Sequence, residues 1–76
     1  MNRKIYHVVR GRRRWLVRGQ RSRRADSAHD FKRSAVERAR ALARDREWDG
    51  QVIVHKKDGS IETEFTYGKD PLRTSG

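Results

Sequence analysis

Two short apolar segments near the start of the chain predict a β-hairpin. Ile5-Tyr6-His7-Val8-Val9 and Trp15-Leu16-Val17 are rich in β-branched and aromatic residues, which favour strands. Gly11 and three arginines lie between them, so the loop is short and its tip is loaded with arginine. We predict strands at about 4–10 and 14–19, followed by a polar connecting loop over residues 19–30.

A helical spacing of apolar residues follows this loop. Small and aliphatic residues recur at intervals of three and four, which is the stripe of an amphipathic helix. They are Ala35, Val36, Ala39, Leu42 and Ala43. The opposite side carries charges of both signs on Arg33, Glu37, Arg40, Arg44 and Glu47. We predict a helix over about 31–47, with Asp30 as its N-cap, Trp48 packed near its end and Asp49-Gly50 stopping it.

Two further strand patterns complete the series. Residues 51–57 contain Val52-Ile53-Val54, and Asp58-Gly59 is a strong signal for a two-residue hairpin turn, because both turn positions favour positive φ. Residues 60–67 then alternate between two faces. One face holds Ile61, Thr63, Phe65 and Tyr67, and the other holds Glu62, Glu64 and Thr66. One face of this strand is therefore predicted to be buried and the other solvated.

The order of these elements, ββαββ, predicts an α+β fold. Its simplest packing is a four-stranded antiparallel sheet of two hairpins, with the helix packed on one face. One helix cannot cover both faces, so the other is left for solvent, a ligand or a second copy, and a homodimer stays open. We expect a single domain over residues 1–71 and a loose C-terminal tail over residues 72–76.

The charged residues are distributed unevenly along the chain. The 76 residues contain 20 Lys+Arg and 10 Asp+Glu, a net charge of +10. Residues 1–24 hold ten of these bases and no acid, so the whole excess lies in the first third of the chain. Arginine dominates, and its planar fork of donors can grip a phosphate with two bonds. A solvated basic surface is the alternative explanation of this pattern.

Several classes of protein are disfavoured by what the sequence lacks. It has no cysteine, hence no disulfides or thiolate zinc site, which fits the cytoplasm. The apolar runs are far shorter than the ~18–20 residues that a membrane span needs, and no signal core follows the first residues. The six glycines are scattered, without a phosphate loop or nucleophile elbow. We therefore expect a cytoplasmic protein that contacts no membrane, is not an enzyme and uses no cofactor or metal.

The histidines are the remaining candidates for chemistry. His7 and His55 lie in different predicted strands, and Asp58 follows His55 by three residues. If the two strands pair and the rings share a face, the two histidines would bind a metal or shuttle a proton. The protein would then be an enzyme that uses His7, His55 and Asp58. The alternative, which we favour, is that the ring nitrogens bond to neighbouring groups. Glu62 and Glu64 are expected to point the same way, as the solvated side of their strand.

The ordered motifs resemble a known family. They are Tyr6-His7-Val8-Val9, Trp15-x-Val17, Val52-x-Val54-His55-x-x-Asp58-Gly59 and Thr66-Tyr67-Gly68-x-Asp70-Pro71. Over about residues 5–71 this series resembles the small bacterial and phage proteins of domain of unknown function 2188. The resemblance implies a compact cytoplasmic domain and brings no activity, cofactor or catalytic residue.

The chain departs from that family pattern in two places. Relatives usually carry Pro and Gly in the first loop, where this chain has Arg10-Gly11-Arg12-Arg13-Arg14. Relatives commonly begin the helix with Thr and place Glu three residues later, whereas Phe31 and Ser34 stand here, so the capping box is lost. The arginine cluster is therefore interpreted as an addition to a shared scaffold, whose fold does not define a function.

Eight arginines between positions 10 and 24 are the candidate binding residues. They are Arg10, Arg12, Arg13, Arg14, Arg18, Arg21, Arg23 and Arg24. Clustered cations bind phosphates without reading sequence, and a β-hairpin can lie in a groove, so we expect one continuous patch. Trp15 could stack on a base, but its place beside Val17 favours the core.

We therefore predict a small, non-catalytic nucleic-acid-binding protein that makes mainly backbone contacts, with DNA rather than RNA as its partner. The alternative is a phage or host interaction or inhibitor protein that docks its basic hairpin on an acidic protein surface, since electrostatic steering serves both equally.

Overall fold

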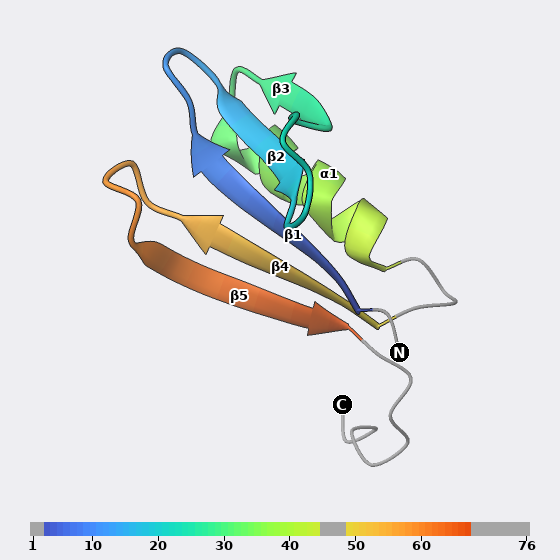
Figure 1. Cartoon of the computed structure of the whole chain (residues 1–76). Helices are drawn as coiled ribbons and strands as arrows, with labels where there is room; N and C mark the ends of the chain where they lie inside the picture. The colour runs from blue at the N-terminus through green and yellow to red at the C-terminus, as the bar shows by residue number, and fades with distance from the viewer. Residues whose placement is uncertain (1–2, 45–48, 68–76) are drawn as a thin grey trace.

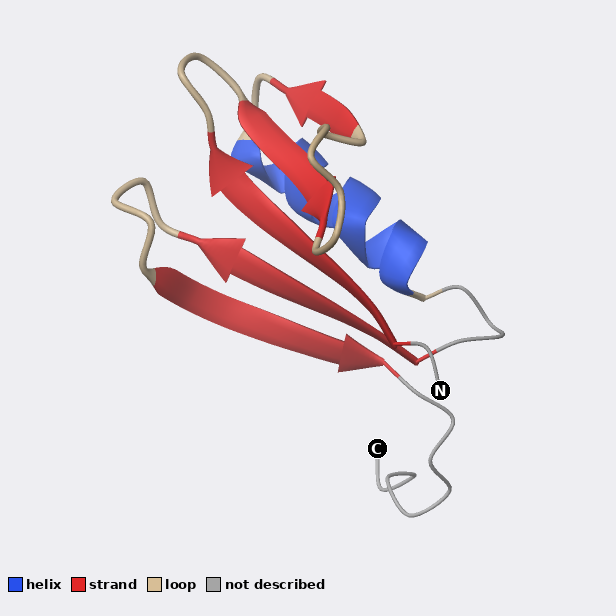
Figure 2. Ribbon diagram, viewed as in Figure 1, coloured by secondary structure: helices blue, strands red, loops and turns tan. Residues whose placement is uncertain are grey.

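The computed structural model describes residues 3–44 and 49–67. Its elements are β1 (Arg3–Arg10), β2 (Trp15–Gly19), β3 (Ser27–His29), α1 (Lys32–Ala43), β4 (Asp49–His55) and β5 (Ile61–Tyr67). The strands form one sheet in the order β3-β2-β1-β4-β5, and α1 lies along one face of it (Figures 1 and 2). The α+β class is confirmed, but the predicted four-stranded antiparallel sheet is wrong, because β1 and β4 pair in parallel and a fifth strand is present.

The additional strand, β3, explains the parallel pair. It lies in the segment that was predicted to be a loop, and it pairs antiparallel with β2, with His29 opposite Trp15. This pairing returns the chain to the end of the sheet where the first hairpin turns, so α1 starts there. The helix then runs back to the opposite end, and β4 begins beside the start of β1, with Asp49 opposite Arg3. Without β3 the chain would enter β4 from the other end, antiparallel to β1.

The core is built from small side chains. Val8, Val17, Val52 and Val54 of the three central strands are fully buried against Ala35, Ala39 and Ala43 of α1. The predicted helix stripe is therefore confirmed, with Val36 and Leu42 half-buried at its margins. Trp15 is 6% exposed and closes one end of this core, which confirms its structural role. Because alanine has so little volume, the helix can lie close to the sheet.

The helix begins and ends differently from the prediction. Phe31 is its N-cap and makes no side-chain capping bond, whereas Asp30, the predicted cap, forms an ion pair with Arg14 at 3.2 Å. The helix ends at Ala43, with Arg44 as its C-cap. The predicted continuation through residue 47 and the packing of Trp48 lie largely outside the described residues, and Asp49 and Gly50 open strand β4.

Arg40, predicted to be on the solvent side of the helix, covers the flank of the core instead. Its guanidinium lies 4.7 Å from the centre of the Phe65 ring, and its Nε donates a hydrogen bond to the Tyr67 hydroxyl at 2.7 Å. Strand β5 is at the margin of the sheet, beside β4. A long arginine stem can cover such apolar surface while its charged group reaches water.

The turn between β4 and β5 is also longer than predicted. Gly59 donates to the Lys56 carbonyl at 2.9 Å, and Lys56 donates to the Ser60 carbonyl at 2.7 Å, which closes a three-residue loop. Within this turn only Gly59 has a positive φ, of 95°, so the predicted two-residue turn with two positive φ angles is wrong. The Asp58 carboxylate accepts bonds from the Ser60 hydroxyl at 2.7 Å and the Ser60 amide at 2.9 Å. These bonds, the hydroxyl first, lower the pKa of Asp58 below its ordinary value.

An irregularity in this hairpin separates the two glutamates of β5. The register passes from Val54 opposite Thr63 to His55 opposite Ile61, which leaves Glu62 as the extra residue of a β-bulge. Glu62 contacts Lys32 at the start of the helix, whereas Glu64 accepts a bond from Gln51 on the other face at 3.1 Å. The expectation that Glu62 and Glu64 point the same way is therefore wrong. Ile61 is 54% exposed and is not buried with Phe65 and Tyr67.

The face of the sheet opposite α1, which we call the open face, is covered by no helix among the described residues. Its side chains alternate along the strands with those of the core. They include the half-buried Ile5, His7, Val9, Leu16, Ile53 and His55 and the exposed Arg18. The open face thus combines a centre of aliphatic and imidazole groups with a charged margin.

Candidate nucleic-acid interface

The tip of the first hairpin presents Arg12, Arg13 and Arg14, all exposed. The loop is closed by the Gly11 amide, which donates to the Arg14 carbonyl at 2.7 Å. Arg14 Nε lies 3.2 Å from an oxygen of Asp30, but its side chain remains 59% exposed. Such exposed ion pairs contribute only about 0–1 kcal/mol, so Asp30 holds Arg14 weakly. We call Arg12, Arg13 and Arg14 the tip cluster.

A second group of arginines lies at the other end of β2. Arg21, Arg23 and Arg24 are exposed in the segment that joins β2 to β3, and we call them the loop cluster. Backbone bonds order this segment: Ser22 donates to the Gly19 carbonyl at 3.0 Å, and Asp26 donates to the Val17 carbonyl at 2.6 Å. The Ser22 hydroxyl also donates to the Arg24 carbonyl at 2.9 Å. The loop cluster is therefore presented by a hydrogen-bonded loop.

The two arginines of the hairpin strands lie on opposite faces. Arg10 pairs with Trp15 in the register, and its guanidinium lies 5.6 Å from the centre of the Trp15 ring on the side of the helix. Arg18 pairs with His7 and lies on the open face. Since β2 has five residues, its two ends are about 15 Å apart. Arg18 thus connects the tip and loop clusters, and Arg10 stands apart from them, so the eight arginines do not share one surface.

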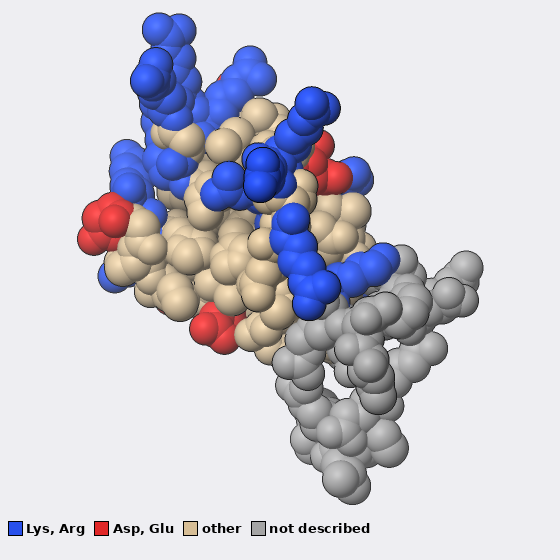
Figure 3. All heavy atoms as spheres, in the orientation of Figure 1, with Lys and Arg blue, Asp and Glu red and all other residues tan. Residues whose placement is uncertain are grey.

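Figure 3 shows how charge is divided over the open face, because the helix lies behind the sheet in that orientation. Lys and Arg side chains gather over the hairpin tip and along the side of β2 and β3, where red groups also appear among them, and further red groups lie at the β4–β5 margin. Among the described residues, no carboxylate pairs with Arg12, Arg13, Arg18, Arg21, Arg23 or Arg24. The basic margin is therefore largely uncompensated.

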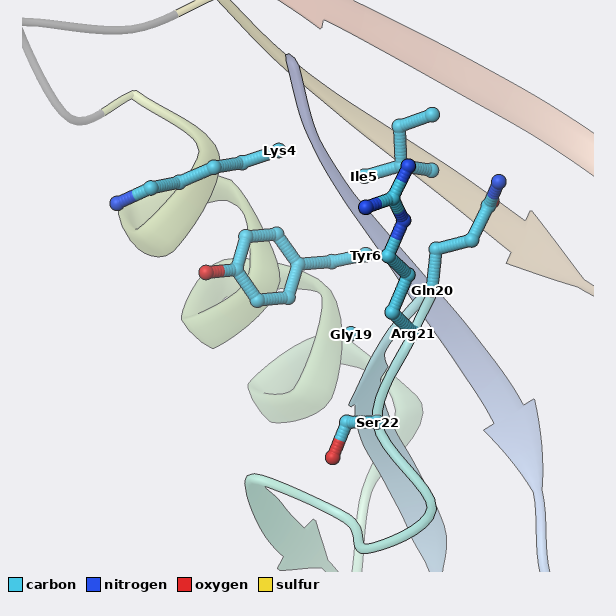
Figure 4. Close-up of a pocket in the computed structure, with 7 residues that line it drawn as sticks. All are labelled: Lys4, Ile5, Tyr6, Gly19, Gln20, Arg21 and Ser22. Carbon is cyan, nitrogen blue, oxygen red and sulfur yellow. The ribbon is translucent and has the colours of Figure 1, made fainter. Parts of the chain in front are cut away.

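A shallow hollow of about 580 Å³ adjoins the loop cluster. It is lined by Lys4, Ile5, Tyr6, Gly19, Gln20, Arg21 and Ser22. Figure 4 shows Arg21 turned back beside Ile5 and Gln20, while Lys4 and Tyr6 extend to the other side of β1. Arg21 is thus placed beside Ile5 and Gln20 at the point where β1 begins and β2 ends.

The structure also brings together the two histidines of the open face. His7 Nδ1 lies 3.0 Å from His55 Nε2, and their ring centres are 5.2 Å apart. Asp58 does not join them, because its carboxylate is bonded to Ser60. His29 bonds to the Ser27 hydroxyl at 2.8 Å. In the described part of the chain, no group of three or more histidines and carboxylates is placed to hold a metal ion.

Two residues near these sites were missed by the sequence analysis. Gln20 Oε1 lies 2.9 Å from His7 Nε2, and no sequence signal marks it, because the contact depends on the register of β1 and β2. Phe31 is 72% exposed and follows Asp30, the partner of the tip cluster. No sequence signal marks its exposure, because Phe31 continues the four-residue spacing of the buried Ala35, Ala39 and Ala43.

These elements define a small α+β protein in which one helix backs a five-stranded mixed sheet. The chain belongs to the family described as "Uncharacterized protein conserved in bacteria (DUF2188)", which matches residues 6–67. It is 32% identical over 65 residues to "Uncharacterized protein YdaT" of Bacillus subtilis (strain 168), a match that covers 86% of this chain and 42% of that protein. The chain thus spans less than half the length of this relative.

The expected family resemblance is therefore confirmed. No solved structure matches the chain. Within the residues that are described, no helix has the length and apolar character that a membrane crossing requires. Neither of the matching descriptions states an activity, so a function has to be argued from the residues themselves.

Proposed function

We propose that this protein binds nucleic acid through phosphate contacts of the tip cluster, Arg18 and the loop cluster. The observation that carries the proposal is the set of exposed guanidinium groups on β2 and in the loops at its two ends; among the described residues, only Arg14 of this set pairs with a carboxylate. Phosphates follow one another along a strand every few ångströms, and a cation that contacts one releases a condensed counterion. A basic margin about 15 Å long, the length of β2, would span several phosphates.

The shape of the open face favours backbone contacts over base stacking. Trp15 is buried, and Tyr6, Phe65 and Tyr67 pack against the core, so these aromatic rings are not available as stacking platforms. The centre of the open face instead offers aliphatic groups and the bonded histidine pair. A protein of this kind would bind with little dependence on sequence, and the cytoplasm is the compartment that suits it.

The salt dependence of binding tests this proposal. For a short labelled DNA duplex, contact with about five phosphates should make log affinity fall against log salt with a slope near −4.5. Replacing Arg12, Arg13 and Arg14 together by Ala should reduce that slope by about 2–3, since each lost phosphate contact removes roughly 0.9. Fluorescence anisotropy over a range of salt concentrations measures both values.

A matched control separates local contacts from net charge. Replacing Arg33, Arg44 and Lys57 by Ala also removes three positive charges, but Arg33 and Arg44 are exposed at the two ends of the helix and Lys57 in the β4–β5 turn, and none of them belongs to the tip or loop cluster. This variant should keep nearly the whole slope. Equal slopes for the two triple variants would contradict the proposal, and so would binding that is insensitive to salt. If polyglutamate displaced the protein from DNA as effectively as a phosphate polymer does, the partner would be an acidic protein instead.

Phe31 gives the proposal a second test. Phe31 follows Asp30, which pairs with Arg14 of the tip cluster, and its ring is exposed, so we expect it to stack on an unpaired base held at that cluster. Phe31→Ala should weaken binding of single-stranded DNA by about 1–3 kcal/mol, the usual contribution of one stacked base. Duplex binding should be unchanged, because its bases are already stacked. The same anisotropy assay compares the two substrates, and an equal loss for both would exclude a stacking role.

A further inference from the structure

The contact between His7 and His55 lies on the open face, where β1 and β4 pair in parallel. Val8 is opposite Val54 in this register. His7 precedes Val8 on β1 and His55 follows Val54 on β4, and the two rings meet over the open face. His7 Nδ1 and His55 Nε2 are 3.0 Å apart, and the ring planes are tilted by 32°. Both residues are half-buried, and the helix on the opposite face leaves them accessible to small solutes.

The outer ring nitrogens of both histidines face oxygen atoms. His7 Nε2 lies 2.9 Å from Gln20 Oε1, and His55 Nδ1 lies 3.0 Å from the Gly59 carbonyl oxygen. Oxygens of this kind accept hydrogen bonds and have no hydrogen to donate, so the ring nitrogens that face them carry the hydrogens. A neutral imidazole has only one N–H. The two inner nitrogens are then both bare, with lone pairs directed into the same 3.0 Å space.

Two bare nitrogens at this separation repel each other unless a cation, either a proton or a metal ion, lies between or beside them. We infer that His7 and His55 form a two-histidine site for a divalent transition-metal ion that prefers imidazole, such as Zn²⁺, Ni²⁺ or Cu²⁺. With Zn–N bonds of about 2.0 Å and a tetrahedral angle, two ligand nitrogens lie about 3.3 Å apart. The observed 3.0 Å is close to this separation, and both rings would turn so that their lone pairs point at the ion.

The surroundings of the pair match those of metal-binding histidines. Such histidines almost always donate their second N–H to a carbonyl or a carboxylate, which fixes the ring and leaves the other nitrogen bare. Gln20 and Gly59 supply those acceptors here. Because no third histidine or carboxylate joins the pair among the described residues, the remaining metal positions are open to water or to an anion. This inference does not depend on the proposed binding of nucleic acid.

Titration of the purified protein with Zn²⁺, followed by calorimetry, tests the site. We expect one ion per chain with a dissociation constant in roughly the micromolar range, because two protein ligands supply about half of the donors of a structural zinc site. His7→Ala and His55→Ala should each weaken binding by about tenfold or more. His29→Ala is the matched control, since His29 is bonded to Ser27 away from the pair, and it should bind Zn²⁺ as the unchanged protein does.

Substitutions of Gln20 test which ring nitrogen of His7 carries the hydrogen. An amide can present either oxygen or nitrogen to His7, whereas a carboxylate can only accept. Gln20→Glu should therefore strengthen Zn²⁺ binding, and Gln20→Ala should weaken it by about tenfold. If Gln20→Glu weakened binding instead, the amide nitrogen would be the group that faces His7, and the proposed arrangement of hydrogens would be wrong.

Nitrogen NMR of the unchanged protein gives a readout that does not rely on the folding of variants. Zn²⁺ should shift the signals of His7 Nδ1 and His55 Nε2, while the two outer nitrogens keep their hydrogens. Zn²⁺ uptake that survives both His7→Ala and His55→Ala would overturn the site. So would a titration that leaves both rings unchanged, in which case a proton shared between the two inner nitrogens would account for their contact.

Discussion

Gly50→Ala is expected to lower the free energy of unfolding by about 3 kcal/mol or more, or to prevent folding. A Cβ atom at this position would lie 1.9 Å from the Ala43 carbonyl oxygen and 2.7 Å from the Ala43 carbonyl carbon. Both atoms belong to the helix backbone, so no side-chain rotation relieves the overlap. The end of α1 would have to lift from β4, which would uncover the buried Ala43 and Val52.

Gly19→Ala is the matched control for this effect. A Cβ atom there would meet its neighbours at 3.7 Å and 3.9 Å, which is ordinary contact, and Gly19 does not have a positive φ. The free energy of unfolding of the Gly19→Ala variant should change little or rise slightly, since alanine restricts the unfolded chain more than glycine does. Urea unfolding followed by circular dichroism measures both variants. Equal midpoints for the two would show that α1 does not lie against Gly50.

Ala39→Leu is expected to cost about 3 kcal/mol of stability. Ala39 is fully buried in the cluster that contains Val8 and Val52. Extra methylene groups in such a core force side chains off their rotamers or move the backbone, at about 1–3 kcal/mol and occasionally more. The cost should lie at the upper end here, because the buried stripe of α1 is made only of alanine and its backbone therefore lies close to the sheet.

The same substitution two residues further along the helix provides the comparison. Ala41 is exposed, and leucine is nearly as good a helix former as alanine. Ala41→Leu should therefore change stability by no more than about 0.5 kcal/mol. For a domain of this size a loss of 3 kcal/mol lowers the melting temperature by roughly 12–24 °C, so thermal denaturation distinguishes the two variants readily. Similar melting temperatures for the two variants would mean that the helix does not pack on the sheet through its alanines.

Four of the five strands and the helix could be predicted from the sequence, because their patterns are local. Alternation along residues 5–9 and the spacing of Ala35, Ala39 and Ala43 depend on the geometry of a single segment. The confinement of the excess charge to residues 1–24 is likewise a property of the chain alone. These features were sufficient to predict the α+β class and the face of the helix that is buried, although Ile61 and Thr63 of the predicted buried face of β5 are exposed.

Strand β3 and the parallel pair could not be predicted in the same way. Ser27-Ala28-His29 has no strand pattern of its own, and it is extended because the backbone of β2 offers it hydrogen-bonding partners. Once β3 exists, the direction of β4 follows from where the chain enters the helix. The bulge at Glu62 has a similar origin, since it depends on how the β4–β5 turn closes.

The candidate site also combines features that could be predicted from the sequence with features that depend on the fold. The sequence by itself determined that the arginines are clustered, that Trp15 belongs to the core and that two histidines lie in strands. Only the tertiary structure decided that Arg10 and Arg18 point to opposite faces and that His7 meets His55 beside Gln20. The physical reason is register: shifting a strand pair by one residue turns every side chain to the other face, and register is set by contacts between segments far apart along the chain.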